Sequence, residues 1–497
     1  MTGPTPRFDY QAIVPPVDEL GAVHLVGIGG AGMSGIARML HARGVPVTGS
    51  DSRPGPAVAA LAADAIPVRV GHDGAHVAAA DTVVVSSAIR EDNLELAEAR
   101  ARGLRVLHRS QALAALARDA RCRIAVAGAN GKTTTSPMLA VVATLAGADP
   151  SYAVGGDPVQ LSANAHLGAG DAFVIEADES DGSFVVYHPH VAIVTSVQPD
   201  HLDYYGTVAA VEAGYRAFVD TIEPGGVLIA CVDDPGARRL ADYAATRGLT
   251  VLGYGTSSDA QVRLSDIMLT GLGARARVHC GDAAYPMALA VPGEHNLLNA
   301  AGVLAAAIHG LGRDDSLSGG ARSADAPFWL DLLSRFRGVR RRFERVGEAA
   351  GITVVDDYAH NPAKVRAAVA TGLAAVPGGG RLVVLFQPHL YSRTRDFATE
   401  FGAALAPADV VIVADVYAAR EDPIPAVSGA LVADATRAAR AGAHVRFVAE
   451  RGELVPTLMG LLRRGDLVLT IGAGDVTLLG PELIAALEHG GDPGGAP

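Results

Sequence analysis

A strand, a glycine-rich turn carrying one lysine, and a helix follow one another between residues 123 and 145. The apolar run RIAVA (residues 123–127) predicts a buried strand, and residues 133–145 predict a helix. The turn between them keeps Lys132, one of only two lysines among 41 basic residues. A turn of this form points backbone N–H groups and the helix N-terminus at a phosphate, and its lysine reaches the β and γ phosphates. We therefore predict an α/β chain with a phosphate-binding loop.

This loop has the short form GxxGKT, because Val126 stands where the usual pattern has its first glycine. Arginine replaces lysine almost everywhere else in the chain, so position 132 favours a compact ammonium over a planar guanidinium. The hydroxyl of Thr133 can hold Mg²⁺. The alternative is an ordinary glycine turn between a strand and a helix. The predicted ATP-contacting residues of the loop are Gly128, Ala129, Asn130, Gly131, Lys132, Thr133 and Thr134.

A second glycine loop, GIGGAG at residues 27–32, lies between a predicted strand (residues 23–26) and a predicted helix (residues 33–43). Asp51 follows 19 residues after the last glycine, at the end of a strand predicted from residue 45 to 48. This spacing is typical of dinucleotide sites, but its physical basis is a pyrophosphate on a helix N-terminus. A UDP-sugar carries the same group, so a UDP-sugar and a nicotinamide cofactor are both compatible with the pattern.

Acidic and histidine side chains follow two further predicted strands. Glu176 opens the run EADESD after residues 173–175, and His201 lies in QPDHLD after residues 191–195. Carboxylates at the carboxyl ends of parallel strands suit Mg²⁺, so Thr133, Glu176 and His201 are the predicted metal ligands. Mn²⁺ is the alternative ion. A solvated acidic turn and a structural histidine are the alternatives to a metal site.

Arginines crowd into residues 335–345, where the last third of the chain begins. Such a run is usually a solvated face, but at a domain junction one guanidinium can stabilise phosphoryl transfer, and we assign this role to Arg342. Two polar turns follow strands at residues 354–362 and 387–395, and their histidines and arginines could bind an amino acid carboxylate. The start of an alanine-rich helix at residues 292–299 could contact adenine.

Composition limits the partners of the chain. The net charge of −12 argues against a nucleic-acid-binding face, and no apolar stretch approaches the roughly 18 residues of a membrane span. The start of the chain lacks the apolar segment of a signal peptide, and the three scattered cysteines match no metal spacing. These features predict a cytoplasmic enzyme that acts on small-molecule substrates. We expect it to be a monomer or a weak homodimer.

Three blocks are predicted, each alternating strands with helices. They cover residues 1–121, 122–327 and 328–497, with a polar linker at residues 312–327 and a disordered tail at 490–497. The fold class is therefore α/β with three domains: an N-terminal Rossmann-like parallel sheet, a central P-loop-type ATPase domain and a C-terminal Rossmann-like domain.

With these motifs together, the chain resembles the Mur ligases from about Val23 to Leu483. The blocks that carry the resemblance are residues 27–34 (GIGGAGMS), 86–89 (SSAI), 131–135 (GKTTT), 176–183 (EADESDGS), 200–203 (DHLD), 338–344 (GVRRRFE), 387–394 (QPHLYSRT), 415–423 (DVYAAREDP) and 472–476 (GAGDV). The resemblance implies an ATP-dependent ligase that adds L-alanine to UDP-N-acetylmuramate through an acyl phosphate.

The resemblance also implies roles for single residues. Lys132, Glu176, His201, Arg342 and His360 would be catalytic. The UDP-sugar would be held by Gly29, Gly30, Gly32, Ser34, Asp51 and Ser87. Asn296 would contact adenine, Arg342 the phosphates and Asp357 the ribose, and the amino acid would be placed by Tyr358, His360 and Arg393.

Three positions depart from the family pattern: Asn130, Asn361 and Leu167 stand where histidine is usual. These departures leave open a second ligase that uses the same chemistry on another carboxylate and amine. Pro137 falls inside the predicted helix, where it removes one backbone hydrogen bond. A nicotinamide-dependent dehydrogenase and a non-catalytic UDP-sugar-binding protein are the alternatives from other classes.

Overall fold

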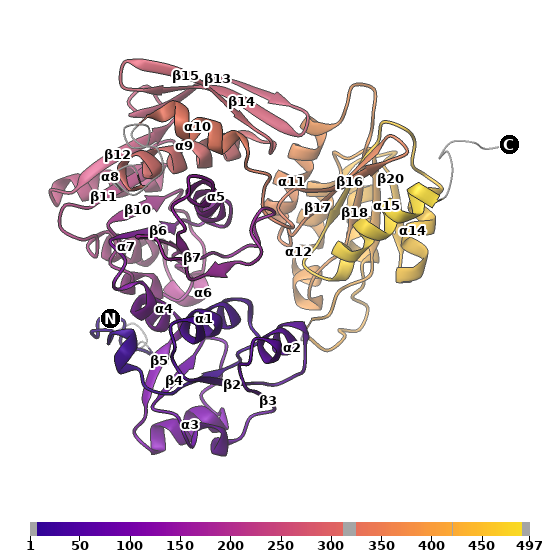
Figure 1. Cartoon of the computed structure of the whole chain (residues 1–497). Coiled ribbons are helices and arrows are strands. Elements are labelled where there is room, and N and C mark those ends of the chain that lie inside the picture. The colour runs from indigo at the N-terminus through magenta and orange to yellow at the C-terminus, as the bar shows by residue number, and fades with distance from the viewer. Residues whose placement is uncertain (1–6, 312–324, 420, 490–497) are drawn as a thin grey trace. The chain divides into compact units, whose positions relative to one another are not determined.

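The computed structural model describes residues 7–311, 325–419 and 421–489, and its chain packs as two compact units (Figure 1). Unit 1 comprises Met1–Ile267, Ala276–Ala288 and His295–Phe336, and unit 2 comprises Met268–Arg275, Leu289–Glu294 and Arg337–Pro497. The predicted linker lies mostly outside the described residues, and the predicted tail lies entirely outside them. None of the described helices is long and apolar enough to cross a membrane.

The first sheet of unit 1 is parallel, with the strand order β3-β2-β1-β4-β5. The order reverses beside β1, so the loop after β1 lies at a topological switch point, where ligands of such sheets bind. The strands are β1 (Val23–Val26), β2 (Val47–Asp51), β3 (Val68–Val70), β4 (Thr82–Val85) and β5 (Arg105–His108). The helices are α1 (Ala31–Ala42), α2 (Pro56–Ala63), α3 (Leu94–Ala101) and α4 (Arg109–Ala117).

The start of one strand and the start of one helix in this part of the chain differ from the prediction. The second strand begins at Val47, two residues later than predicted, because Pro46 has no N–H to donate to a ladder. Helix α1 begins at Ala31, two residues earlier than predicted. The glycine loop therefore leads directly into the first helical turn.

A fully buried carboxylate, Glu95 on α3, lies inside this first sheet's domain. Its oxygens face Ser50, His24 at 3.7 Å, His72 at 3.3 Å and His76 at 2.7 Å. Burial by itself would raise the pKa of Glu95, but hydrogen bonds with these neighbours outweigh burial and lower it to about 2. An ionised carboxylate thus links α3 to β2, the strand that ends at Asp51.

The central sheet has ten strands in the order β15-β14-β13-β12-β11-β10-β6-β9-β7-β8. Its strands β6, β9, β10 and β11 run parallel and are almost entirely buried, as their continuous apolar runs predict. The strands are β6 (Cys122–Ala127), β7 (Ser151–Ala153), β8 (Ala165–His166), β9 (Ala172–Glu176), β10 (Val191–Val194), β11 (Val227–Cys231), β12 (Thr250–Gly255), β13 (Val262–Thr270), β14 (Gly273–Cys280) and β15 (Ala283–Leu289).

The helices of this part of the chain connect those strands. Helix α5 continues through Pro137, whose ring is buried. Helix α10 packs on α5 and belongs to unit 1, which extends to Phe336. The helices are α5 (Lys132–Leu145), α6 (Leu202–Tyr205), α7 (Val208–Val219), α8 (Pro235–Thr246), α9 (Glu294–His309) and α10 (Ala326–Ser334).

The chain passes between the two units several times. Met268–Arg275 and Leu289–Glu294, which include the ends of β13, β14 and β15, belong to unit 2 although the rest of these strands belongs to unit 1. Leu272, in the turn between β13 and β14, packs against the core of unit 2. Unit 2 is therefore built from three separate stretches of sequence.

Unit 2 holds a six-stranded sheet in the order β16-β17-β21-β18-β19-β20, parallel except for β16. The strands are β16 (Glu344–Ala349), β17 (Ile352–Asp357), β18 (Leu382–Phe386), β19 (Val410–Ala414), β20 (His444–Val448) and β21 (Leu467–Ile471). The helices are α11 (Pro362–Ala375), α12 (Tyr391–Leu405), α13 (Ala430–Ala439), α14 (Arg451–Met459) and α15 (Leu479–His489). Apolar side chains cover both faces of the sheet.

Candidate functional site

The phosphate loop leaves the carboxyl end of β6 and enters α5 with two glycines in the left-handed region. Gly128 has φ +140°, and a Cβ there would lie 2.0 Å from Oγ1 of Thr195. Gly131 has φ +93° and is the N-cap of α5. The amide of Asn130 donates to Oγ of Ser196 at 3.0 Å, so the strand end of β10 fixes the loop. The glycine spacing is thus required by the backbone and by the close approach of β10.

Lys132 pairs with a carboxylate that sequence reasoning did not select. Its Nζ donates to Oε1 of Glu179 at 2.9 Å and to the carbonyl oxygen of Gly128 at 3.2 Å. The Glu179 side chain is 2% exposed, and its Oε2 has no hydrogen-bond partner. Burial raises the pKa of the Glu179 carboxyl against the opposing effect of Lys132. For Lys132, burial would lower the pKa, but the facing carboxylates outweigh it and raise the pKa above its ordinary value.

Glu176 and Thr133 meet as predicted, whereas His201 lies beside a different carboxylate. Oε1 of Glu176 accepts from Thr133 at 2.9 Å, and Oε2 accepts from Ser136 at 2.8 Å and from the Gly155 amide at 2.9 Å. Nε2 of His201 is 3.8 Å from Oε1 of Glu179. Glu176 is the last residue of β9 and not the first after it.

These oxygens are suitable donors for Mg²⁺, which prefers carboxylate and hydroxyl oxygen together with substrate phosphates. Within the described residues, no three His, Cys, Asp or Glu side chains converge as a set that could hold a metal by themselves. Thr133 and Glu176 fit one side of a magnesium site, and phosphate oxygens would have to supply the rest. The metal assignment therefore stays a prediction.

The first glycine loop is built at the carboxyl end of β1. The amides of Gly27 and Ile28 donate to the carbonyl oxygen of Ser50, and the amide of Gly29 donates to Oδ2 of Asp51 at 2.9 Å. The predicted ligand residue Asp51 thus orders the loop. Ser34 is buried in the first turn of α1, where its hydroxyl donates to the carbonyl oxygen of Ala31 at 3.2 Å.

Ser87, after β4, lies beside two side chains that the sequence did not place there. Its hydroxyl donates to Asp181, and it lies 3.0 Å from Nε2 of His108. Burial lowers the pKa of His108 to about 4, so its ring is neutral at neutral pH. Asp181 comes from the acidic run at residues 176–181, which therefore contacts the first sheet's domain as well as the phosphate loop.

Asn296 lies in the first turns of α9 and is 8% exposed. The same part of α9 reaches the phosphate loop, because a Cβ on Gly131 would lie 2.8 Å from Oδ1 of Asn299. The predicted adenine residue therefore lies on the helix that adjoins the loop.

In unit 2, the ring of Tyr358 contacts two arginines of the predicted cluster. The guanidinium of Arg341 lies 4.7 Å from the ring centroid, and that of Arg342 lies 5.7 Å away. Arg341 also donates to the carbonyl oxygen of Gly472 at 2.8 Å. Arg341 is thus tied to the loop after β21, a role that the arginine pattern did not reveal.

His360 and Arg393 meet at the carboxyl ends of β17 and β18, as predicted. Nη1 of Arg393 donates to the carbonyl oxygen of His360 at 3.3 Å, and burial lowers the pKa of His360 to about 4. Asp357 accepts from the amides of Phe343 at 2.9 Å and Ala359 at 2.8 Å. Burial raises the pKa of Asp357 to about 6 despite these two bonds.

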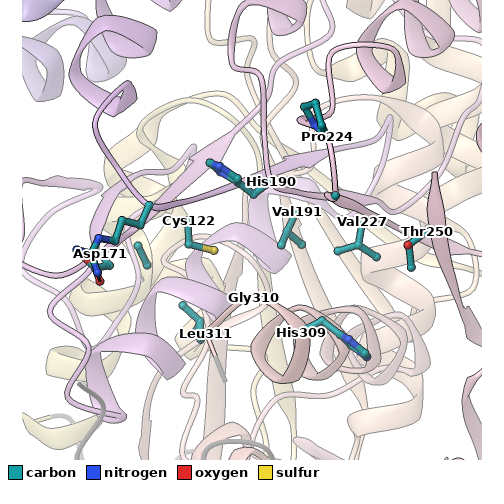
Figure 2. Close-up of a pocket in the computed structure, with 13 residues that line it drawn as sticks. Cys122, Asp171, His190, Val191, Pro224, Val227, Thr250, His309, Gly310 and Leu311 are labelled. Carbon is teal, nitrogen blue, oxygen red and sulfur yellow. Dashed lines mark hydrogen bonds and ion pairs between the residues drawn. The ribbon is translucent and has the colours of Figure 1, made fainter. Parts of the chain in front are cut away.

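A cavity of about 640 Å³ lies at the opposite edge of the central sheet (Figure 2). It is lined at the amino ends of β6, β9, β10, β11 and β12, and Figure 2 shows Cys122, His190 and His309 around it. The phosphate loop follows the carboxyl end of β6, so this cavity is not part of the candidate site.

The fold and the phosphate loop define the chain as an α/β protein of the phosphate-loop type. Three family models match it: the Mur ligase family catalytic domain at residues 22–121, the Mur ligase middle domain at 126–307 and the Mur ligase glutamate ligase domain at 341–474. The chain belongs to the Mur ligase family.

Curated relatives match the chain along almost its whole length. A protein of Kineococcus radiotolerans named UDP-N-acetylmuramate–L-alanine ligase is 54% identical over 98% of this chain and 99% of its own length. A protein of the same name from Renibacterium salmoninarum is 47% identical over 96% of this chain and 99% of its own length. The solved structure of UDP-N-acetylmuramate-alanine ligase MurC from Thermotoga maritima has a TM-score of 0.75 and 28% identity, covering 93% of this chain and 98% of that one. The three-domain α/β prediction is confirmed.

Proposed function

We propose that this chain joins L-alanine to UDP-N-acetylmuramate with conversion of ATP to ADP and phosphate, as a step of peptidoglycan precursor synthesis. The observation that carries the proposal is the phosphate loop with Lys132 and Thr133 each held by a carboxylate of the same acidic run. The substrate assignment is supported by full-length relatives of that name at up to 54% identity. Family membership weighs against the dehydrogenase alternative.

The chemistry begins with a carboxylate, which is a poor electrophile toward an amine. Transfer of the γ phosphoryl group from ATP to the carboxylate oxygen gives an acyl phosphate and ADP. The alanine amine then attacks the acyl carbon, an amide forms, and phosphate leaves. Lys132 would stabilise the charge on the transferring group, and the amides at the start of α5 would hold the β phosphate.

Thr133 and Glu176 would hold Mg²⁺, with His201 as a further ligand and Mn²⁺ as the alternative ion. The ion would supply charge neutralisation on the phosphate oxygens. Asn296 would contact adenine, Arg342 the phosphates and Asp357 the ribose. The UDP-sugar would be held by the loop containing Gly29, Gly30 and Gly32, together with Ser34, Asp51 and Ser87.

His360 would accept a hydrogen bond from the alanine amine and so orient it for attack. Its Nδ1 lies 3.0 Å from the carbonyl oxygen of Tyr358, so that nitrogen is assigned the proton and Nε2 is left as an acceptor. Because burial lowers the pKa of His360 to about 4, the ring is neutral at neutral pH and its Nε2 can accept a hydrogen bond. Tyr358 and Arg393 would place the amino acid carboxylate.

Two of the three positions that depart from the family pattern have hydrogen-bond partners. Asn130 donates from Nδ2 to Gln198 at 3.1 Å, and Asn361 caps α11 by accepting from the Lys364 amide at 2.9 Å. These contacts support a working site with asparagine at both positions. A cytoplasmic location and a monomeric or weakly dimeric state complete the proposal.

The test is ADP release by the purified chain with Mg-ATP, UDP-N-acetylmuramate and single amino acids, with mass detection of the product. A product heavier by one alanine residue, formed only with ATP, is expected. ADP production with a different amino acid alone would support the second ligase. Lys132→Ala should abolish ADP release while UDP-sugar binding survives.

A further inference from the structure

Arg109 occupies a position that helix electrostatics disfavour. It is the first residue of α4, where the helix carries partial positive charge, and its side chain is about two-thirds buried. Burial by itself would lower the pKa of Arg109, but Tyr187, Asp178 and Asp181 outweigh it and raise the pKa above its ordinary value. A cation kept at such a place against local preference is the kind of inconsistency expected at a functional site.

The guanidinium of Arg109 faces the first glycine loop. A Cβ added to Gly32, in the first turn of α1, would lie 3.2 Å from Nη1 of Arg109. Nη2 of the same group donates to Oδ2 of Asp178 at 3.0 Å. One edge of the guanidinium is therefore held by the acidic run, while the other lies beside the helix start that follows the loop.

The loop needs a full positive charge if it holds a pyrophosphate. Its amides at positions 27, 28 and 29 are committed to Ser50 and Asp51, and the Asp51 carboxylate adds negative charge to the same loop. The helix start contributes only about half an elementary charge. In a chain of net charge −12, the attraction for a diphosphate has to come from a local cation.

We propose that Arg109 binds the pyrophosphate of the UDP-sugar and that Asp178 is its positioning residue. This inference rests on the proposed function and adds a substrate contact to it. Asp178 lies in the same run as Glu176, which contacts Thr133, and Glu179, which contacts Lys132. The Arg109–Asp178 pair thereby connects the two phosphate-binding loops through one short segment.

The experiment measures binding of UDP and of a magnesium complex of a non-hydrolysable ATP analogue by calorimetry. Arg109→Gln should raise the Kd of UDP by at least about tenfold, because a charge-assisted hydrogen bond is lost, and should leave the Kd of the ATP analogue within twofold. The dependence of UDP binding on salt concentration should also weaken. Arg109→Lys, which keeps the charge, should retain most of the affinity and guards against a folding defect of the glutamine variant.

Asp178→Asn should raise the Kd of UDP by a smaller factor than Arg109→Gln does. A variant with both substitutions should bind UDP no more weakly than Arg109→Gln alone, because Asp178 acts through Arg109. Arg43→Gln is the matched control, because Arg43 also makes a 3.0 Å bond to an aspartate, Asp119, with a similarly exposed side chain. It should leave UDP binding unchanged.

Three results would overturn the inference. They are UDP binding by Arg109→Gln within twofold of the wild type, an equal loss of UDP and ATP-analogue binding, and an unchanged salt dependence. If the wild-type chain binds no UDP at all, the substrate of the proposed function is refuted as well. If the wild-type chain is an active ligase and Arg109→Gln binds UDP as tightly as the wild type, only the role of Arg109 is refuted.

Discussion

Replacing Lys132 by methionine should destabilise unit 1 as well as abolish catalysis. The side chains of Lys132 and Glu179 are 14% and 2% exposed, so the substitution leaves a buried carboxylate. Oε2 of Glu179 already has no hydrogen-bond partner among the described residues, and Oε1 would lose Lys132 and keep His201 at 3.8 Å. Breaking a buried ion pair by removing one partner typically costs about 3–5 kcal/mol.

A second estimate limits this cost. The stranded Glu179 can take up a proton, and doing so at pH 7 from an ordinary carboxyl pKa near 4.3 costs about 3.7 kcal/mol. Both estimates place the loss at about 3–4 kcal/mol, or about 5 °C in the melting temperature of a unit as large as unit 1. Because protonation becomes cheaper in acid, the loss should shrink to about 1 kcal/mol at pH 5.

The assay is thermal unfolding of the wild type and of Lys132→Met at pH 7.5 and pH 5. Adding Glu179→Gln to the methionine variant should restore most of the lost stability at pH 7.5. Arg335→Met is the matched control, because it breaks an exposed pair with Asp331 and should cost less than about 1 kcal/mol. Equal melting temperatures for the wild type and Lys132→Met at pH 7.5, or a loss that does not depend on pH, would refute this reasoning.

Three further predictions concern other parts of the molecule. Gly128→Ala should weaken binding of the ATP analogue at least about tenfold in a calorimetric titration, since the new Cβ meets Thr195 and position 128 has φ +140°. His108 is neutral when folded, because burial lowers its pKa from 6.5 to about 4; the stability that this gives is present above pH 6.5 and lost as the pH falls toward 4. Between pH 6.5 and pH 4, the unfolding free energy of His108→Gln should fall by up to about 3 kcal/mol less than that of the wild type. A pH series of denaturation curves measures this difference. Glu95→Gln should lower the unfolding free energy by about 2 kcal/mol at pH 7 and flatten its fall between pH 4.5 and 2, where ionised Glu95 loses its contribution in the wild type.

The phosphate loop could be predicted because all its determinants are local. The apolar strand β6, the glycines at positions 128 and 131 and the helix that follows lie within one short stretch of sequence. The same holds for the loop between β1 and α1. The start of β2 at Val47 differs from the prediction because of one proline, Pro46.

The partners of the charged groups could not be predicted in the same way. The run EADESD offers four carboxylates, and the turn after β9 decides that Glu179 faces Lys132 while Asp178 faces Arg109. These pairs join residues 47 and 69 positions apart, so no periodicity in the sequence reports them. Likewise, the sequence around Glu95 is that of an ordinary helix surface, and only the fold brings the histidines His72 and His76 beside its carboxylate.

The passage of the chain between units at β13, β14 and β15 has a consequence for anyone who wants to dissect this protein. A fragment that starts at Arg337 would lack Met268–Arg275 and Leu289–Glu294, and with them the Leu272 side chain that packs into its core. No single cut yields both halves complete. Exchange of unit 2 between relatives, in the laboratory or by recombination, would therefore have to carry the tip of the β13–β14 hairpin along with it.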